Sequence, residues 1–522
     1  MRPDAECGII RGVMGKLKIA AMAALLVALP CEASQRRRPN VVFLLADDLG
    51  YGDVGFCPCP ATNVLARLRT RHIDSLARGG VTLTSHYAAA PVSAPSRASI
   101  LTGRVQGECS LRDNCFDRAF SETNTLATVL RGAGYATWAV GKWGVAGGGE
   151  SGEPVSSHPL DRGFDYFYGF LDHMAGHTYY HYRGRIRGAY MGVTENRADA
   201  TDGAVGVYST DLYIAKAKSL IRRHVASRRD VPFFLYLAIN TVHGSGRGDS
   251  TLPDKTPLHV PGRPYPAEGV EWPIAPEPPE ARNTWIEPSC RGLPPAAARY
   301  ATAVMRLDEG VGDLLRLLDS LGIADDTMFV FTSDNGPADE YGADPRVFGS
   351  AGALDGLKRD VFEGGLRVPT AVRWPARIRP GSADSEPSQS HDWMATLAAA
   401  AGVAPPADSN GVSLLPRWGA GEEGERARPS LVYSQYCFPW TGATEAFREF
   451  AARKAPVRGL QQMIRVGRYV ALRTRIGESG GGAVRLFDVV SDPFEERDLA
   501  ALPEHAARVA EMKAALDARL RP

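Results

Sequence analysis

Four short apolar runs, each followed closely by polar side chains, constrain the fold most strongly. They cover residues 41–45, 137–140, 233–239 and 328–331, with helical patterns between them. Runs that are apolar at nearly every position are typical of strands buried on both faces of a sheet that helices cover. In such α/β folds the functional site lies beyond the carboxyl ends of the strands. The sequence therefore predicts a large mixed, mostly parallel sheet flanked by helices, with one shared site.

The residues that follow these runs fit a metal and anion site. Two of the runs lead into paired oxygen donors, and oxygen-only ligands favour calcium or magnesium over zinc. Alternatively, each such pair, close to a glycine, only makes a turn. Two pairs in one place favour the metal, because crowded carboxylates repel one another without a cation. The four strand ends lead to Asp47 and Asp48, to Lys142, to His243, and to Asp334 and Asn335.

Ser93 stands just before a helix that we predict over residues 96–102, starting after Pro95. The start of a helix suits contact with an anion. An unmodified serine is a weak nucleophile and needs a base or a metal. A metal, a nucleophile, cations and a proton donor together predict hydrolysis of a tetrahedral anion ester. The positive charge and the proton donor would come from Arg97, Lys142, Lys358 and His243.

Length and composition indicate a soluble chain with one large and one smaller domain. Apolar residues make up 44% of the 522 residues. The 60 basic and 59 acidic side chains give no reason to expect nucleic-acid or bulk membrane binding. A Gly/Glu-rich stretch at 419–425 separates a predicted catalytic domain, residues 35–425, from an α+β subdomain, residues 426–522. In the subdomain we expect antiparallel strands over 431–436, 463–474 and 483–490, then a helix over 504–520.

The N-terminus resembles an export signal. Lys16 and Lys18 precede an apolar run over 19–29 that is too short to span a bilayer. We therefore expect a signal peptide over residues 1–34 and a periplasmic or secreted protein without an integral membrane segment. A lipid anchor at Cys31 is disfavoured by the Leu29-Pro30 pair before it. Export makes disulfides possible, and the spacing of Cys109 and Cys115 would suit a small local loop.

A longer motif carries a specific resemblance. Ser93 opens the run SAPSRASILTGR, residues 93–104. It is accompanied by PNVV at 39–42, DDLG at 47–50, GKW at 141–143, TSDNG at 332–336 and EGGLRVP at 363–369. Over residues 38 to 500 the chain resembles the formylglycine-dependent sulfatases. The resemblance implies an alkaline phosphatase-like fold and hydrolysis of sulfate esters, either of a carbohydrate or of an aryl alcohol.

The resemblance also implies residue roles. Ser93 matches the residue oxidised to formylglycine, whose hydrated aldehyde attacks sulfur. A serine there resembles the bacterial subtype matured by an anaerobic radical enzyme. Arg97 matches the residue that holds the formylglycine. Lys142 and Lys358 match residues that bind sulfate, and His243 matches the proton donor to the leaving alcohol. One calcium ion would be bound by Asp47, Asp48, Ser93, Asp334 and Asn335.

One position departs from the family pattern. Many sulfatases carry a histidine two residues after the first lysine, and here that position is Gly144. We hypothesise that His177 supplies the missing imidazole. The alternative is that His177 contacts substrate or is structural.

The substrate and two other functions are less constrained by the sequence. A Pro-rich loop at 252–295 carries Tyr265, Trp272 and Trp285, which would suit a sulfated carbohydrate; alternatively, these rings pack on their own domain. A phosphate-ester hydrolase with unmodified Ser93 is a second possibility, disfavoured because the sequence shows no histidine-rich ligand set. The third is an inactive sulfated-glycan-binding homologue.

Overall fold

The predicted apolar runs form the centre of the largest sheet in the computed structural model. They are β1 (Asn40–Ala46), β4 (Ala136–Lys142), β10 (Phe233–Ala238) and β11 (Thr327–Ser333). β1 pairs in parallel with both β10 and β11, and β10 pairs in parallel with β4. Their carboxyl ends therefore share one edge of the sheet, as predicted.

The structure describes residues 38–57, 70–114, 119–147, 156–186, 188–244, 258–339, 344–421, 427–438 and 459–520. The predicted signal peptide, Cys31 and Cys115 lie outside these ranges, and the expected export stays a prediction. Cys109 is a buried thiol close to the Ser99 and Thr102 hydroxyls. Across the described ranges, no helix has both the length and the apolar character needed to cross a bilayer.

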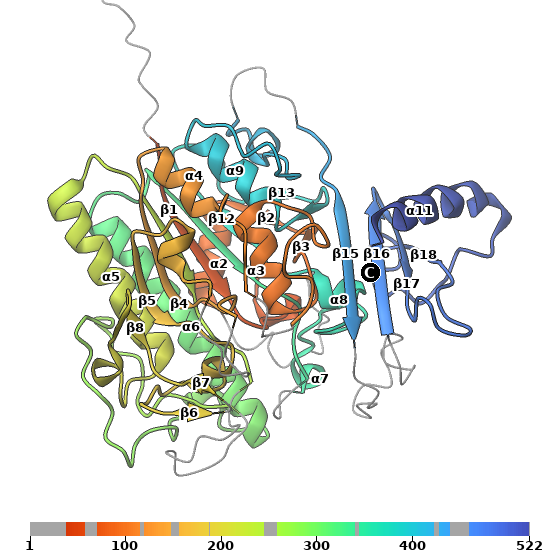
Figure 1. Cartoon of the computed structure of the whole chain (residues 1–522). Helices are drawn as coiled ribbons and strands as arrows, with labels where there is room; N and C mark the ends of the chain where they lie inside the picture. Colours follow the sequence, from red (N-terminus) through yellow and green to blue (C-terminus); the bar gives the residue numbers. More distant parts are fainter. Residues whose placement is uncertain are drawn as a thin grey trace, which may run out of the picture. The chain divides into compact units, whose positions relative to one another are not determined.

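Ten strands make up the large sheet, in the order β13-β2-β12-β11-β1-β10-β4-β5-β8-β9. Figure 1 shows the sheet with helices around it. β4 pairs with β5 and β13 with β2 in parallel, whereas β12, β8 and β9 pair antiparallel. The sheet is thus mixed and mostly parallel at its centre, which confirms the predicted class. The remaining strands are β2 (Val81–Leu83), β5 (Tyr166–Phe170), β8 (Thr194–Glu195), β9 (Ala198–Asp199), β12 (Ala371–Arg373) and β13 (Ser382–Asp384).

Helices cover both faces of this sheet. Alternate side chains of β1 point to opposite faces: Val42 belongs to one apolar core and Phe43 to the other. The first core is shared with α2 (Arg71–Arg78), α5 (Ser209–Arg228) and α6 (Pro295–Ser320). The second is shared with α3 (Ser93–Thr102), α4 (Leu126–Gly132) and α9 (Asp392–Ala400). Short elements complete this part: α7 (Pro345–Phe348), α8 (Glu363–Leu366), β3 (His86–Tyr87), β14 (Ser388–Gln389), β6 (Arg185–Ile186) and β7 (Ala189–Tyr190).

A separate four-stranded antiparallel sheet follows, as expected. It contains β15 (Val432–Phe438), β16 (Gly459–Val466), β17 (Tyr469–Arg473) and β18 (Arg485–Asp488), and α11 (Ala506–Arg519) packs on it through Met512 and Leu516. The single run predicted over 463–474 is two strands, because the chain turns at Gly467, where φ is +60°. Residues 39–522 form one unit, and the domain boundary at 426 stays a prediction.

The Pro-rich segment is irregular over most of residues 258–294, with one short 3-10 turn, Pro288–Cys290. Trp272 packs edge-on against Tyr168, and the Tyr265 hydroxyl donates to Asp313 Oδ2 at 2.9 Å. These two aromatic side chains therefore pack on their own domain, which was the alternative to sugar contact. Trp285 lines a cavity of about 540 Å³ together with Tyr265.

Candidate active site

Two pairs of oxygen donors meet at the carboxyl ends of β1 and β11. Asp47 and Asp48 follow β1, and Asp334 and Asn335 follow β11, whose last residue is paired with Ala46. The Asp48 amide donates to Asp334 Oδ1 at 3.2 Å, and Asn335 Nδ2 donates to Asp48 Oδ1 at 2.8 Å. All four side chains are buried. The register of two neighbouring strands thus brings together residues that are nearly 290 positions apart.

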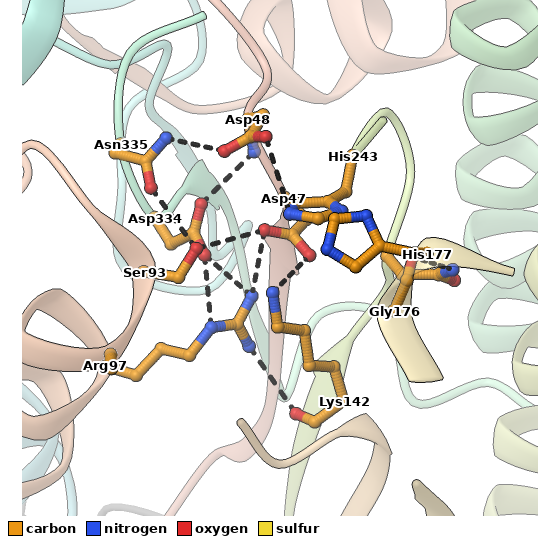
Figure 2. A network of polar contacts seen from close by, with 12 residues as sticks. Asp47, Asp48, Ser93, Arg97, Lys142, Gly176, His177, His243, Asp334 and Asn335 are labelled. Carbon is orange, nitrogen blue, oxygen red and sulfur yellow. Dashed lines mark hydrogen bonds and ion pairs between the residues drawn. The ribbon is translucent and has the colours of Figure 1, made fainter. Parts of the chain in front are cut away.

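Ser93 joins this group as the first residue of α3. Its Oγ lies 3.3 Å from Asp47 Oδ1 and 3.3 Å from Asn335 Oδ1 (Figure 2). Ser93 belongs to the helix, which begins three residues earlier than the predicted start at Ser96. The hydroxyl is buried with the four donors, so the predicted oxygen set is brought together in one place.

Three cations face the three carboxylates. Arg97, one turn along α3, donates to Asp334 Oδ2 from Nε at 3.1 Å and from Nη2 at 2.8 Å. Lys142 Nζ lies 2.6 Å from Asp47 Oδ2, and Lys358 Nζ lies 2.8 Å from Asp48 Oδ2. All three side chains are at most 2% exposed. The formal charges of the six groups cancel.

Burial shifts the pKa values of two charged groups in this cluster. Burial raises the pKa of Asp334, and the nearby Asp47 carboxylate raises it further. Burial lowers the pKa of Lys142, which the contact with Asp47 only partly offsets. Such shifts are expected where like charges crowd together away from water. An oxygen-only donor set, with carboxylates held in place before any ion binds, fits a hard divalent cation such as calcium.

His243 lies beside the carboxylates, in the loop after β10. Its Nε2 is 3.9 Å from Asp48 Oδ2, and neither ring nitrogen has a hydrogen-bond partner among the residues described. Burial lowers the pKa of this imidazole well below its ordinary value, with further lowering by the Lys358 and Lys142 charges. The predicted proton donor is therefore at the site, and its ring nitrogens are available to a ligand.

His177 is also brought to the site, at the end of a 3-10 turn, Met174–His177. Its ring centroid is 4.5 Å from that of His243, and its Nδ1 lies 2.8 Å from the Gly244 carbonyl oxygen (Figure 2). His173 stands next to both, with centroids 5.1 Å from His177 and 5.4 Å from His243. We did not select His173 from the sequence, although it stands four residues before His177, and we assign it no role in the hydrolysis.

Gly144 adopts a backbone conformation that favours glycine. Its φ is +72°, in the left-handed region, and a Cβ would lie 3.1 Å from Lys142 Cε and 3.6 Å from Arg97 Cδ. A side chain at this position would therefore crowd Lys142, whereas its approach to Arg97 is an ordinary contact. The role of His177 as a replacement stays a prediction.

Comparisons with known proteins decide the family. A model of the sulfatase family matches residues 39–403, and a model described as N-sulphoglucosamine sulphohydrolase, C-terminal, matches residues 349–458. The chain belongs to the sulfatase family. This sulfatase is 30% identical over 444 residues to N-acetylgalactosamine-6-sulfatase of Canis lupus familiaris, covering 79% of this chain and 74% of the relative. It is 30% identical over 571 residues to steryl-sulfatase of Mus musculus, covering 97% and 86%.

A solved structure supports the same fold. The crystal structure of Ps i-CgsB in complex with k-i-k-neocarrahexaose is 25% identical, with a TM-score of 0.66 and 92% of each chain covered. The sulfatase has the alkaline phosphatase-like fold implied by its sequence, and it is a sulfuric ester hydrolase.

Proposed function

We propose that the sulfatase removes sulfate from a sulfated carbohydrate, using formylglycine derived from Ser93 and one bound calcium ion. The observation that carries the proposal is the position of Ser93 Oγ, 3.3 Å from both Asp47 Oδ1 and Asn335 Oδ1. A residue that serves both as a metal ligand and as the nucleophile must lie next to the other oxygen ligands, as Ser93 does.

The calcium ion would be held by Asp47, Asp48, Asp334, Asn335 and the modified residue 93. When bound, it would offset the charge that develops on the sulfate oxygens and orient the nucleophile. Arg97 is fixed on Asp334 by two hydrogen bonds and would hold residue 93 in place. Lys142 and Lys358 would each turn one N–H toward the sulfate while keeping their contacts with Asp47 and Asp48.

The modified residue 93 would supply, as its hydrate, a nucleophilic oxygen and a second hydroxyl through which sulfate is released. His243 would donate a proton to the leaving alkoxide, a step worth about 10²–10⁴-fold in rate. An anionic ester beside His243 would favour the protonated imidazole, against the effect of Lys142 and Lys358. His177, oriented through Nδ1 by the Gly244 carbonyl, would supply the imidazole absent at position 144.

A carbohydrate substrate is supported by the N-acetylgalactosamine-6-sulfatase relative. The steryl-sulfatase relative makes a steryl sulfate the natural comparison in any assay. Serine at position 93 requires a maturation enzyme, for which we propose the radical, anaerobic type. Cleavage of a signal peptide over residues 1–34 would deliver the protein to the periplasm or the medium.

Two measurements test the proposal together. Mass spectrometry of the Ser93 peptide, from protein made in its native host, should show the mass of the aldehyde. The same protein should hydrolyse sulfated mono- or disaccharides faster than aryl sulfate, steryl sulfate or phosphate esters. Ser93→Ala should abolish turnover, whereas Ser99→Ala on the same helix should retain it. Unmodified Ser93 with phosphate-ester turnover, or an aldehyde without turnover of any sulfated sugar, would overturn the proposal.

A further inference from the structure

Three imidazoles meet beside the carboxylate cluster. His173 and His177 come from the loop after β5, and His243 comes from the loop after β10. Their ring centroids are separated by 5.1, 5.4 and 4.5 Å. For three imidazoles on one tetrahedral zinc, bond lengths of about 2.0–2.1 Å place the ring centres roughly 5 Å apart. The spacing of the three rings therefore matches that of a three-histidine metal centre.

The orientation of the rings supports the same interpretation. His177 Nδ1 faces the Gly244 carbonyl oxygen at 2.8 Å. A histidine that binds metal commonly donates its other N–H to a backbone carbonyl in this way. His243 is buried, and among the described residues no group accepts from or donates to either of its nitrogens. One ring nitrogen from each histidine lies within 4.8 Å of the other two.

We propose that His173, His177 and His243 bind a borderline divalent cation such as Zn²⁺, at a site distinct from the oxygen site. Imidazole nitrogens suit zinc, copper and nickel, whereas carboxylate and amide oxygens suit calcium. The two sites therefore select different ions although they are neighbours. Asp48 Oδ2, 3.9 Å from His243 Nε2, places negative charge at the edge of the histidine site. His173 is the one residue of the three that is partly exposed.

Binding at this site would make zinc a reversible inhibitor. A metal on His243 occupies the nitrogen that would carry the proton for the leaving alcohol. This consequence rests on the proposed function, whereas metal binding itself does not. Zinc would then inhibit without displacing calcium, because its ligands are nitrogens.

Cobalt(II) tests the binding step directly, since a tetrahedral Co²⁺ site absorbs strongly in the visible region. The full-length protein in excess calcium should bind one Co²⁺ with such a spectrum, and Zn²⁺ should bleach it. His173→Gln should weaken Co²⁺ binding by at least about tenfold, because even the loss of a group that only orients a ligand costs about that much. His505→Gln, in the C-terminal part of the chain, is the matched control and should bind normally.

The same variants test inhibition. Zn²⁺ should inhibit the wild type reversibly, with activity restored by a chelator used in excess calcium. His173→Gln should keep its turnover without zinc and need at least about tenfold more Zn²⁺ for half-inhibition. Ser93→Ala separates the two proposals, because it should bind Co²⁺ whether or not the sulfatase mechanism holds. A Co²⁺ spectrum that is absent, weak and octahedral, or unchanged in His173→Gln would overturn the metal site.

Discussion

Lys142→Met tests whether the carboxylate cluster is built to be completed by calcium. Lys142 Nζ lies 2.6 Å from Asp47 Oδ2, and both side chains are fully buried. Removing one partner of a buried pair costs about 3–5 kcal/mol, because the other charge stays buried without compensation. Asp47 would keep the Arg97 guanidinium, 3.7 Å away, as a charged partner and the Ser93 hydroxyl, 3.3 Å away, as a neutral one. In a chelator, the free energy of unfolding should therefore fall by about 3–5 kcal/mol.

Calcium should remove much of that loss. A divalent ion on Asp47 supplies the positive charge that the methionine side chain lacks, so we expect the loss to be less than half as large in calcium. The assay is denaturant unfolding of wild type and variant, each in calcium and in chelator, followed by tryptophan fluorescence. The midpoint and the slope of each transition together give the free energy.

Lys218→Met is the matched control. Lys218 Nζ lies 2.8 Å from both oxygens of Asp313, with 1% and 4% of the two side chains exposed. This pair is as buried as that of Lys142 but lies among residues that we do not assign to the site. Its loss should cost a similar free energy in calcium and in chelator. If Lys142→Met also lost the same free energy in both buffers, the reasoning would be refuted.

Three further outcomes are expected. Gly144→Ala puts a Cβ 3.1 Å from Lys142 Cε on a left-handed backbone, so turnover should fall while stability drops by about 1–2 kcal/mol; unchanged turnover at intact calcium content contradicts this. Purified His177→Ala with intact calcium should lose most of its turnover, and retained turnover would remove His177 from the mechanism. Burial lowers the pKa of His86 from 6.5 to about 3. Between pH 6.5 and pH 3, the His86 imidazole therefore binds a proton only in the unfolded state. Stability is then greatest above pH 6.5 and falls by about 1.4 kcal/mol per unit toward pH 3; His86→Gln should show a shallower slope in pH-dependent unfolding.

The sheet and the oxygen donors could be predicted because both depend on local patterns. Each central strand is a continuous apolar run, and each ends where the polar residues begin. The motif around Ser93 and the parallel pairing of β1 with β11 then determine which donors meet. The start of α3 was misplaced by three residues, because Pro95 fits any position of a first helical turn. The run predicted over 463–474 was wrong as a single strand, because the chain turns at Gly467.

The histidine cluster could not be found in this way. His173 and His177 reach His243 through a loop after β5, and no apolar period in the sequence specifies the path of such a loop. The sequence shows no histidine-rich ligand set, yet the fold brings three histidines together beside the carboxylates. The contacts of the aromatic side chains in the Pro-rich segment could not be predicted for a related reason. Only the packed structure shows that Trp272 contacts Tyr168 and that Lys216 Nζ lies 4.1 Å from the Trp272 ring centre.

The pairing of three buried cations with three buried carboxylates has a consequence for the order of events. Without an ion, this pocket offers an anion no net attraction; with a divalent ion it carries two uncompensated positive charges. Calcium and sulfate must then strengthen each other's binding by the same factor, because such coupling is reciprocal. Free sulfate would then compete with the substrate only on the calcium-loaded enzyme. Bound sulfate would also slow the dissociation of calcium.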